Sequence, residues 1–88
     1  MDKEKLEDVK TKLNEIADIL YKGDVIEGLA NMNCVISDIA AIASDMPDEE
    51  TRQKLIDNAL TPLLEAMEQE DGTLMADLIS YELLPLLN

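Results

Sequence analysis

The chain has 88 residues, of which 47% are hydrophobic, and its 20 acidic and 7 basic side chains give a net charge of −13 at pH 7. This length suits a single domain spanning residues 1–88, and the apolar fraction is that of a folded protein, which excludes a disordered chain. A strongly negative field repels phosphate backbones and anionic lipid surfaces, so we expect no nucleic-acid partner and no membrane partner.

The kinds of apolar residue favour helices. The chain has no Trp or Phe and only two Tyr, so aliphatic side chains make up nearly all of its apolar content. Strands are enriched in aromatic and β-branched residues, which makes a sheet a poor fit. Cys34 is the only cysteine and rules out an internal disulfide. Without an apolar signal core or a run of roughly 18 apolar residues, the protein is expected to be cytoplasmic.

The first predicted helix occupies the segment before Gly23. Its apolar residues recur at helical spacing and form one narrow stripe: Leu6, Val9, Leu13, Ile16, Ala17 and Leu20. Gly23 suits the left-handed position just past a helix end. Asp24, with Glu27 three residues later, has the spacing of a capping box. These signals predict a tight turn between two antiparallel helices.

The second predicted helix runs from this turn towards Pro47. Its predicted apolar stripe consists of Val25, Leu29, Met32, Ile36, Ile39, Ala40 and Ala43. Cys34 lies opposite this stripe, which predicts an exposed thiol. Pro47 ends or starts a helix, and the acids at residues 48–50 place negative charge where a helix N-terminus favours it.

The third predicted helix has a broader apolar stripe. It consists of Leu55, Ile56, Ala59, Leu60, Leu63, Leu64 and Met67. Pro62 lacks an amide donor and clashes with the carbonyl of Asn58, so we expect one helix kinked at Pro62. Gly72 and Thr73 repeat the signal of Gly23 and Asp24, in which one helix ends and the next begins. Together the elements predict an all-α fold, an up-down-up-down antiparallel four-helix bundle made of two αα-hairpins.

The fourth predicted helix begins near Leu74 and is apolar over an arc of about 240°. Packing on two neighbours uses less than that, and three arrangements are open: a central place in the bundle, the seam of a symmetric dimer, or half of a groove for an amphipathic helix of another protein. The candidate interaction surface on this helix consists of Met75, Ile79, Leu83, Leu86 and Leu87.

Two further residues of the fourth helix carry predictions. Glu82 lies inside the apolar arc, where it either reaches solvent at the edge of the arc or forms an ion pair; Lys10, at the edge of the first stripe, is the candidate partner for that pair. Pro85 marks the last turn, where it frees the carbonyl of Tyr81 and is expected to bend or fray the helix.

The sequence lacks the residue types that most catalytic and metal-binding sites require. There is no histidine, and three scattered glycines cannot form a phosphate-binding loop. The acids of residues 68–71 fail as an EF-hand, because with Gly72 at the glycine position Met67 and Leu78 would occupy the first and last ligand positions. Weak, adventitious binding of a cation by Glu68, Glu70 and Asp71 is left as an alternative. We expect no catalytic residue, no dedicated metal site and no cofactor.

Two resemblances follow from these segments. The stretch LTPLLEAMEQEDGTLMADLISYELLPLL resembles the C-terminal half of uncharacterised small acidic all-α domains of Gram-positive bacteria, which end in a similar ADL..YELLPLL. That resemblance implies no activity. In size, charge and helix count the chain is similar to flagellin-type export chaperones, which implies binding of an amphipathic client segment. The Asp-Ser-Leu of acyl carriers is absent from GDVIEG at the start of the second helix.

These observations predict a non-enzymatic protein–protein interaction module that self-associates, as a homodimer, through its fourth helix. The alternative is an export-chaperone-like or adaptor protein that binds an amphipathic helix of a client. A carboxylate- or metal-dependent enzyme is the remote alternative, and a cleft lined by converging carboxylates would be its mark.

Overall fold

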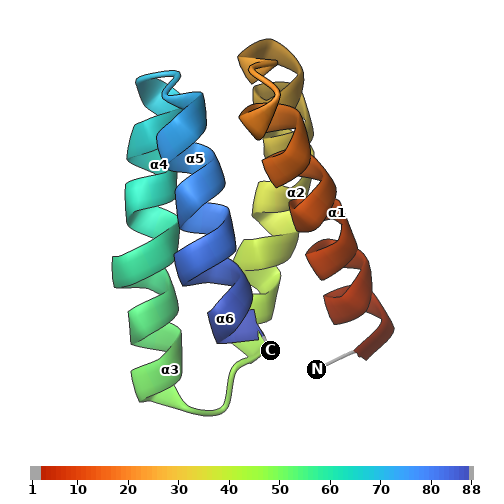
Figure 1. The fold of residues 1–88 in the computed structure, drawn as a ribbon. Helices are drawn as coiled ribbons and strands as arrows, with labels where there is room; N and C mark the ends of the chain where they lie inside the picture. Colours follow the sequence, from red (N-terminus) through yellow and green to blue (C-terminus); the bar gives the residue numbers. More distant parts are fainter. Residues whose placement is uncertain (1–2, 88) are drawn as a thin grey trace.

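The computed structural model describes residues 3–87, and these residues are almost entirely helical. The first hairpin consists of α1 (Lys3–Tyr21) and α2 (Val25–Asp45). Figure 1 shows these two helices side by side, with their turn at the same end of the molecule as the turn of a second hairpin. No strand occurs among the described residues, so the all-α prediction is confirmed.

The second hairpin is built from two composite helices, each with a π-helical segment in its middle or near its end. The segments, in chain order, are α3 (Glu49–Lys54), η1 (Leu55–Leu60), α4 (Thr61–Glu68), α5 (Gly72–Leu78), η2 (Ile79–Leu83) and α6 (Leu84–Leu87). A loop joins the two hairpins at the end of the molecule opposite the two turns (Figure 1).

The first turn forms as its residues predict. Gly23 adopts a φ of 92°, in the left-handed region that glycine occupies without steric cost. The Asp24 carboxylate then accepts a hydrogen bond from the backbone N–H of Glu27 at 3.1 Å, which satisfies one of the free donors at the start of α2.

The second turn uses different residues from those predicted. Glu70, not Gly72, takes the left-handed conformation, with a φ of 55°. Asp71 caps α5 by accepting a hydrogen bond from the Leu74 N–H at 3.1 Å. Gly72 is instead buried inside the helix, where a Cβ would lie 2.7 Å from Cγ2 of Val25. The glycine is therefore required for close contact between the two hairpins and not for the turn.

The third helix begins at an aspartate. Asp48 accepts hydrogen bonds from the Glu50 N–H at 3.1 Å and from the Thr51 hydroxyl at 2.7 Å. This cap follows Pro47 directly, as the predicted break between the hairpins requires.

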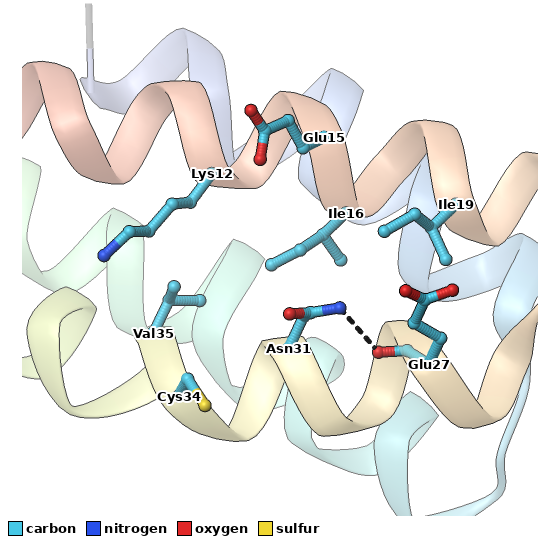
Figure 2. A pocket seen from close by; sticks show the side chains of 8 residues that line it. All are labelled: Lys12, Glu15, Ile16, Ile19, Glu27, Asn31, Cys34 and Val35. Carbon is cyan, nitrogen blue, oxygen red and sulfur yellow. Dashed lines mark hydrogen bonds between the residues drawn. The ribbon is translucent and has the colours of Figure 1, made fainter.

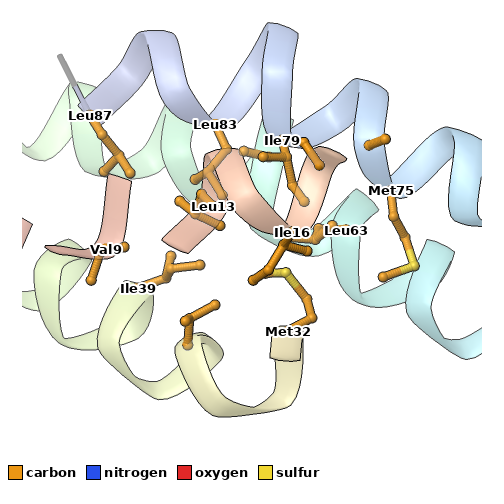
Figure 3. Packing of buried hydrophobic residues seen from close by; sticks show 14 of the residues in the cluster. Val9, Leu13, Ile16, Met32, Ile39, Leu63, Met75, Ile79, Leu83 and Leu87 are labelled. Atoms are coloured by element: carbon orange, nitrogen blue, oxygen red, sulfur yellow. The ribbon is translucent and has the colours of Figure 1, made fainter. Parts of the chain in front are cut away.

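The fourth helix occupies the central place among the alternatives considered. Its segments α5 and η2 pack against α1 on one side and against α4 and η1 on the other. Figure 3 shows Met75, Ile79 and Leu83 directed into the same core as Leu13 and Leu63. Its wide apolar arc is therefore used by neighbours within the chain.

The inner face of α2 differs from the predicted stripe. Val35 and Ile42 are buried, whereas Ala40 is exposed. Within residues 3–87, the most extensive packing of α2 is against α1, and the side that bears Val35 faces the core. In the third helix, Leu64 of the predicted stripe is exposed as well.

Both π-helical segments end two residues before a proline. The residue just before Pro62, Thr61, donates its N–H to the carbonyl of Ile56, five residues back. Leu84, just before Pro85, donates in the same way to Ile79. A π turn widens the helix where the proline has no donor to offer, so it relieves the local conflict that the sequence predicts. The kink at Pro62 itself stays a prediction.

Candidate functional site

The predicted interaction surface on the fourth helix needs a correction. Met75, Ile79 and Leu83 are 0% exposed and Leu87 is 4% exposed, while Leu86 is half-buried against the same core. These side chains face α1, α4 and η1, so they are not accessible to a partner in this fold. The surface available for an interaction must lie elsewhere.

The predicted pair between Lys10 and Glu82 is also wrong. Lys10 Nζ lies 3.4 Å from a carboxylate oxygen of Glu7 on its own helix. Glu82 is exposed at the edge of η2. The contacts that join different helices are instead Lys5 with Asp38 at 3.6 Å, and the Tyr21 hydroxyl donating to an Asp77 carboxylate oxygen at 2.8 Å.

The acidic side chains do not converge. Among residues 3–87, no group of three His, Cys, Asp or Glu side chains is placed to hold a metal ion, and this includes the acids of residues 68–71. No polar or charged side chain in the described part of the chain is buried. The hydrogen bonds from the Thr51 hydroxyl and the Glu50 N–H hold the pKa of Asp48 below its ordinary value of 3.8, the opposite direction from the one a general acid needs.

A shallow groove of about 380 Å³ lies between α1 and α2. Figure 2 shows its apolar floor, formed by Ile16, Ile19 and Val35, and its polar rim. Cys34 lies at one side of it and is exposed, as predicted. On the α2 side, Asn31 donates to the carbonyl of Glu27 at 2.9 Å. Charges of both signs on the rim leave this groove without a preference for one class of charged ligand.

The outer side of α2 is unusual for this molecule because it carries no charge. Six exposed residues form one line along the helix, here called the α2 outer face: Ile26, Ala30, Asn33, Ser37, Ala40 and Ser44. They are spaced four and three residues apart in alternation, which keeps them on one side of a helix. The charged residues of α2 are Glu27, Asp38 and Asp45. All three fall about a quarter turn or more away from this line, towards the α1 side.

By length and composition alone, α2 is also the one described helix apolar enough to cross a membrane. Only 28% of its most apolar window is buried, although it belongs to a small bundle. Ile26, 84% exposed, is the most exposed large apolar side chain among the described residues. Apolar surface is therefore exposed on α2, in addition to that of Leu74 and Tyr81 on the fourth helix.

A second groove adjoins the α2 outer face where α2 passes η1. This α2–η1 groove has a volume of about 430 Å³, and its lining residues are Ala40, Ala43, Ser44, Arg52, Ile56 and Leu60. Its walls are aliphatic apart from the Ser44 hydroxyl and the half-buried Arg52. Leu64, 47% exposed, lies one turn beyond Leu60 on α4 and extends the apolar rim.

Sequence reasoning missed this surface although a signal for it exists. The α2 outer face and the true inner face are both free of charge, so periodicity alone allows either side to face the core. The signal is the confinement of all three charges of α2 to one narrow strip in a chain with 27 charged residues, the sum of 20 acids and 7 bases. A soluble helix with an uncharged outer face is typical of a contact surface.

A family model described as a domain of unknown function, DUF8042, matches residues 3–88. No curated protein and no solved structure matches the chain.

Proposed function

The chain belongs to the DUF8042 family of domains of unknown function, and we propose that it is a non-enzymatic protein–protein interaction module, cytoplasmic and arranged as an up-down-up-down bundle. The observation that carries this proposal is the α2 outer face. It is the uncharged, exposed side of the most apolar helix, on a molecule with a net charge of −13. Contact surfaces are depleted of charge in just this way.

The lack of a built chemical site supports a binding role over an enzymatic one. A two-carboxylate mechanism needs an acid whose pKa burial has raised, and a metal enzyme needs converging ligands. Among the described residues the acids are dispersed at the surface, and no cluster of ligands forms. Helix packing accounts for the buried side chains, which are all hydrophobic.

The proposal is tested by photo-crosslinking in cells that express the protein. A photoreactive amino acid at Asn33, in the middle of the α2 outer face, is expected to give a discrete adduct with another polypeptide. Thr11, exposed on α1, provides the matched control position and is expected to give none. Adding Ala30→Glu to the Asn33 probe is expected to abolish the adduct, because it places a charge in the contact. Equal labelling from both positions would contradict the proposal.

A second candidate function is an export-chaperone-like adaptor that holds an amphipathic helix of a client. The α2–η1 groove favours it, because a helix lying there would meet an aliphatic trough with Ile56 and Leu60 on one wall. Half-buried Met46 and Met67 at the edge of the core would let the surface adapt to different side chains. In the same crosslinking experiment, an adduct with a different protein would favour this reading over self-association.

A further inference from the structure

We propose that the α2–η1 groove is a binding site for a small amphiphilic carboxylate, a molecule with one carboxylate head and a short aliphatic body. The inference goes beyond the proposed function, because that function rests on the uncharged α2 outer face and involves no small molecule. It starts from the chemistry of the groove, which has a polar end and an aliphatic end. The volume of about 430 Å³ lies within the range of about 300–1,000 Å³ that is typical of small-molecule sites.

The polar and the aliphatic residues of the groove are separated along its length. Ser44 lies next to the last residue of α2, and Arg52 lies in the first turn of α3, so both stand near the loop that joins the two hairpins (Figure 1). Ile56 and Leu60 follow Arg52 by one and two turns, which places Leu60 about 12 Å from it along the helix. A molecule whose head is held at the loop end therefore has its body among aliphatic side chains.

The head group is recognised by Arg52, the only arginine of the chain. Its ion pair with Glu49 spans 4.0 Å, the longest of the four pairs defined among residues 3–87, and the Glu49 side chain is 88% exposed. A pair of this kind contributes little, so the guanidinium keeps donors for another partner. Its N–H groups form a fork that fits the two oxygens of a carboxylate. The Ser44 hydroxyl supplies a further donor from the α2 wall.

The aliphatic body has room because α2 and η1 pack loosely against each other. The backbones of α1 and α2 approach closely along their length, whereas those of α2 and η1 approach at few points. The α2 wall carries the small side chains of Ala40 and Ala43, and the opposite wall carries half-buried Ile56 and Leu60. An alkyl chain laid between these walls removes its own apolar surface and theirs from water, which favours binding.

Charge limits the head to a single negative charge. Arg52 is the one charged residue that lines the groove, so a cationic head would meet a like charge there. Three exposed acids near this end, Asp45, Asp48 and Glu49, lie outside the lining and repel a doubly charged phosphate more strongly than a carboxylate. At 0.15 M salt the screening length is about 8 Å, so the contact with Arg52 outweighs the field of the distant acids.

An NMR titration of the ¹⁵N-labelled chain with sodium octanoate in 0.15 M NaCl tests the inference. Saturable shifts are expected at the amides that border the groove and at the side-chain Nε of Arg52. Two matched compounds separate the contributions of head and body. Butyrate has the same head on a shorter chain, and 1-octanol has the same chain without the charge. Each is expected to bind at least about tenfold more weakly than octanoate.

Substitutions on the two sides of the groove test the two ends of the site. Arg52→Gln is expected to weaken octanoate binding at least about tenfold, whereas Lys54→Gln, which removes the same charge from an exposed residue of the same helix, is expected to leave it unchanged. Ala40→Leu fills the aliphatic end and is expected to abolish saturable binding. Ala41→Leu adds the same side chain at an exposed position of α2 outside the groove and is expected to have no effect. Circular dichroism checks that each variant is folded.

Shifts that spread over the surface without saturation would overturn the inference, and so would octanoate binding that neither Arg52→Gln nor Ala40→Leu weakens. Equal binding of 1-octanol and octanoate would also overturn it, because the guanidinium would then play no part. The proposed function has a separate readout. An adduct from Asn33 without saturable octanoate binding would overturn this inference alone, and octanoate binding without the adduct would overturn the proposed function alone.

Discussion

At the scale of single residues, Gly28 sets how closely the two helices of the first hairpin approach. It is buried on α2, and a Cβ there would overlap Cδ2 of Leu20 and lie 2.8 Å from its Cγ. Leu20 is itself only 3% exposed, so it has little room to move away. We expect Gly28→Ala to lower the free energy of unfolding by about 1–3 kcal/mol, because overpacking outweighs the gain in helix propensity. Urea denaturation measures this change.

The cause of that effect can be tested in a second background, in which the change in the free energy of unfolding is expected to reverse its sign. In a Leu20→Ala background the space beside Gly28 is empty, so the added methyl meets no clash. Gly28→Ala is then expected to stabilise the protein by up to about 1 kcal/mol, the usual advantage of alanine over glycine in a helix. If Gly28→Ala destabilises both backgrounds equally, the contact with Leu20 is not the cause.

Asp48 gives a prediction that depends on pH. The Thr51 hydroxyl, first, and then the Glu50 N–H lower its pKa in the folded state below 3.8. Since the folded pKa lies below the unfolded one, the ionised cap stabilises the protein above pH 3.8, and this contribution is lost as the pH falls through the folded pKa. Thr51→Val removes the strongest donor and is expected to bring the pKa back towards 3.8, as followed by carboxyl ¹³C NMR. The same substitution at Thr11, which is exposed on α1, is expected to leave it unchanged.

At the scale of elements, the second hairpin repeats one pattern in its two helices. Residues 56–64 and 79–87 both read I-x-x-x-L-x-P-L-L. In both copies the π-helical segment ends at the first leucine; it starts at the isoleucine in the second copy and one residue earlier, at Leu55, in the first. The segments η1 and η2 also lie against each other in the fold. The repeat therefore places two widened turns at the same level of the hairpin, each ahead of its proline.

This arrangement predicts how the protein tolerates loss of Pro62. A proline inside a regular α-helix costs about 3 kcal/mol, and its removal would return most of that. Because η1 already bonds Thr61 to Ile56, the helix is adapted to the missing donor. We expect Pro62→Ala to change the free energy of unfolding by less than about 1 kcal/mol in urea denaturation. Thr11→Pro, placed in the regular helix α1, is expected to cost about 3 kcal/mol or more. A gain near 3 kcal/mol from Pro62→Ala would show that the proline strains the native helix.

The elements that the sequence predicts well are those with strong local chemistry. Gly23, Asp24 and Pro47 mark the ends of helices because their backbone and hydrogen-bonding properties act within a few residues. At the second turn the same reasoning chose Gly72 for the left-handed position. Gly72 instead packs against Val25, which leaves no room for a Cβ, and Glu70 takes the left-handed conformation in the turn.

The orientation of α2 and the site on it could not be predicted from periodicity. The side that bears Val35 and the side that bears Ala40 are both uncharged, so the choice depends on which neighbours the helix has in three dimensions. The fourth helix shows the converse: its apolar excess suggested a partner, but contact with α1, α4 and η1 uses it. Residue counts on one helix do not reveal how many helices surround it.

At the scale of the whole molecule, the charge is the dominant long-range feature. The chain has twenty acids and seven bases. Of the four ion pairs defined among residues 3–87, three join residues of the same helix. The longest dimension of the molecule is 36 Å. At 0.01 M salt the screening length is about 30 Å, so acids across the whole fold repel one another, whereas at 1 M it is about 3 Å. Self-repulsion of this kind destabilises a compact state.

We therefore expect the melting temperature to rise by several degrees between low and high NaCl, because about 1 kcal/mol shifts it by roughly 4–8 °C in a domain of this size. Calorimetry at several protein concentrations separates this effect from any effect of salt on association. Glu15→Gln and Glu65→Gln, both exposed, reduce the net charge from −13 to −11 with little change in helix propensity. The double variant is expected to melt higher than its parent at low salt and at the same temperature at high salt. A difference that persists at high salt would assign the effect to local contacts of these two side chains and not to the field of the whole molecule.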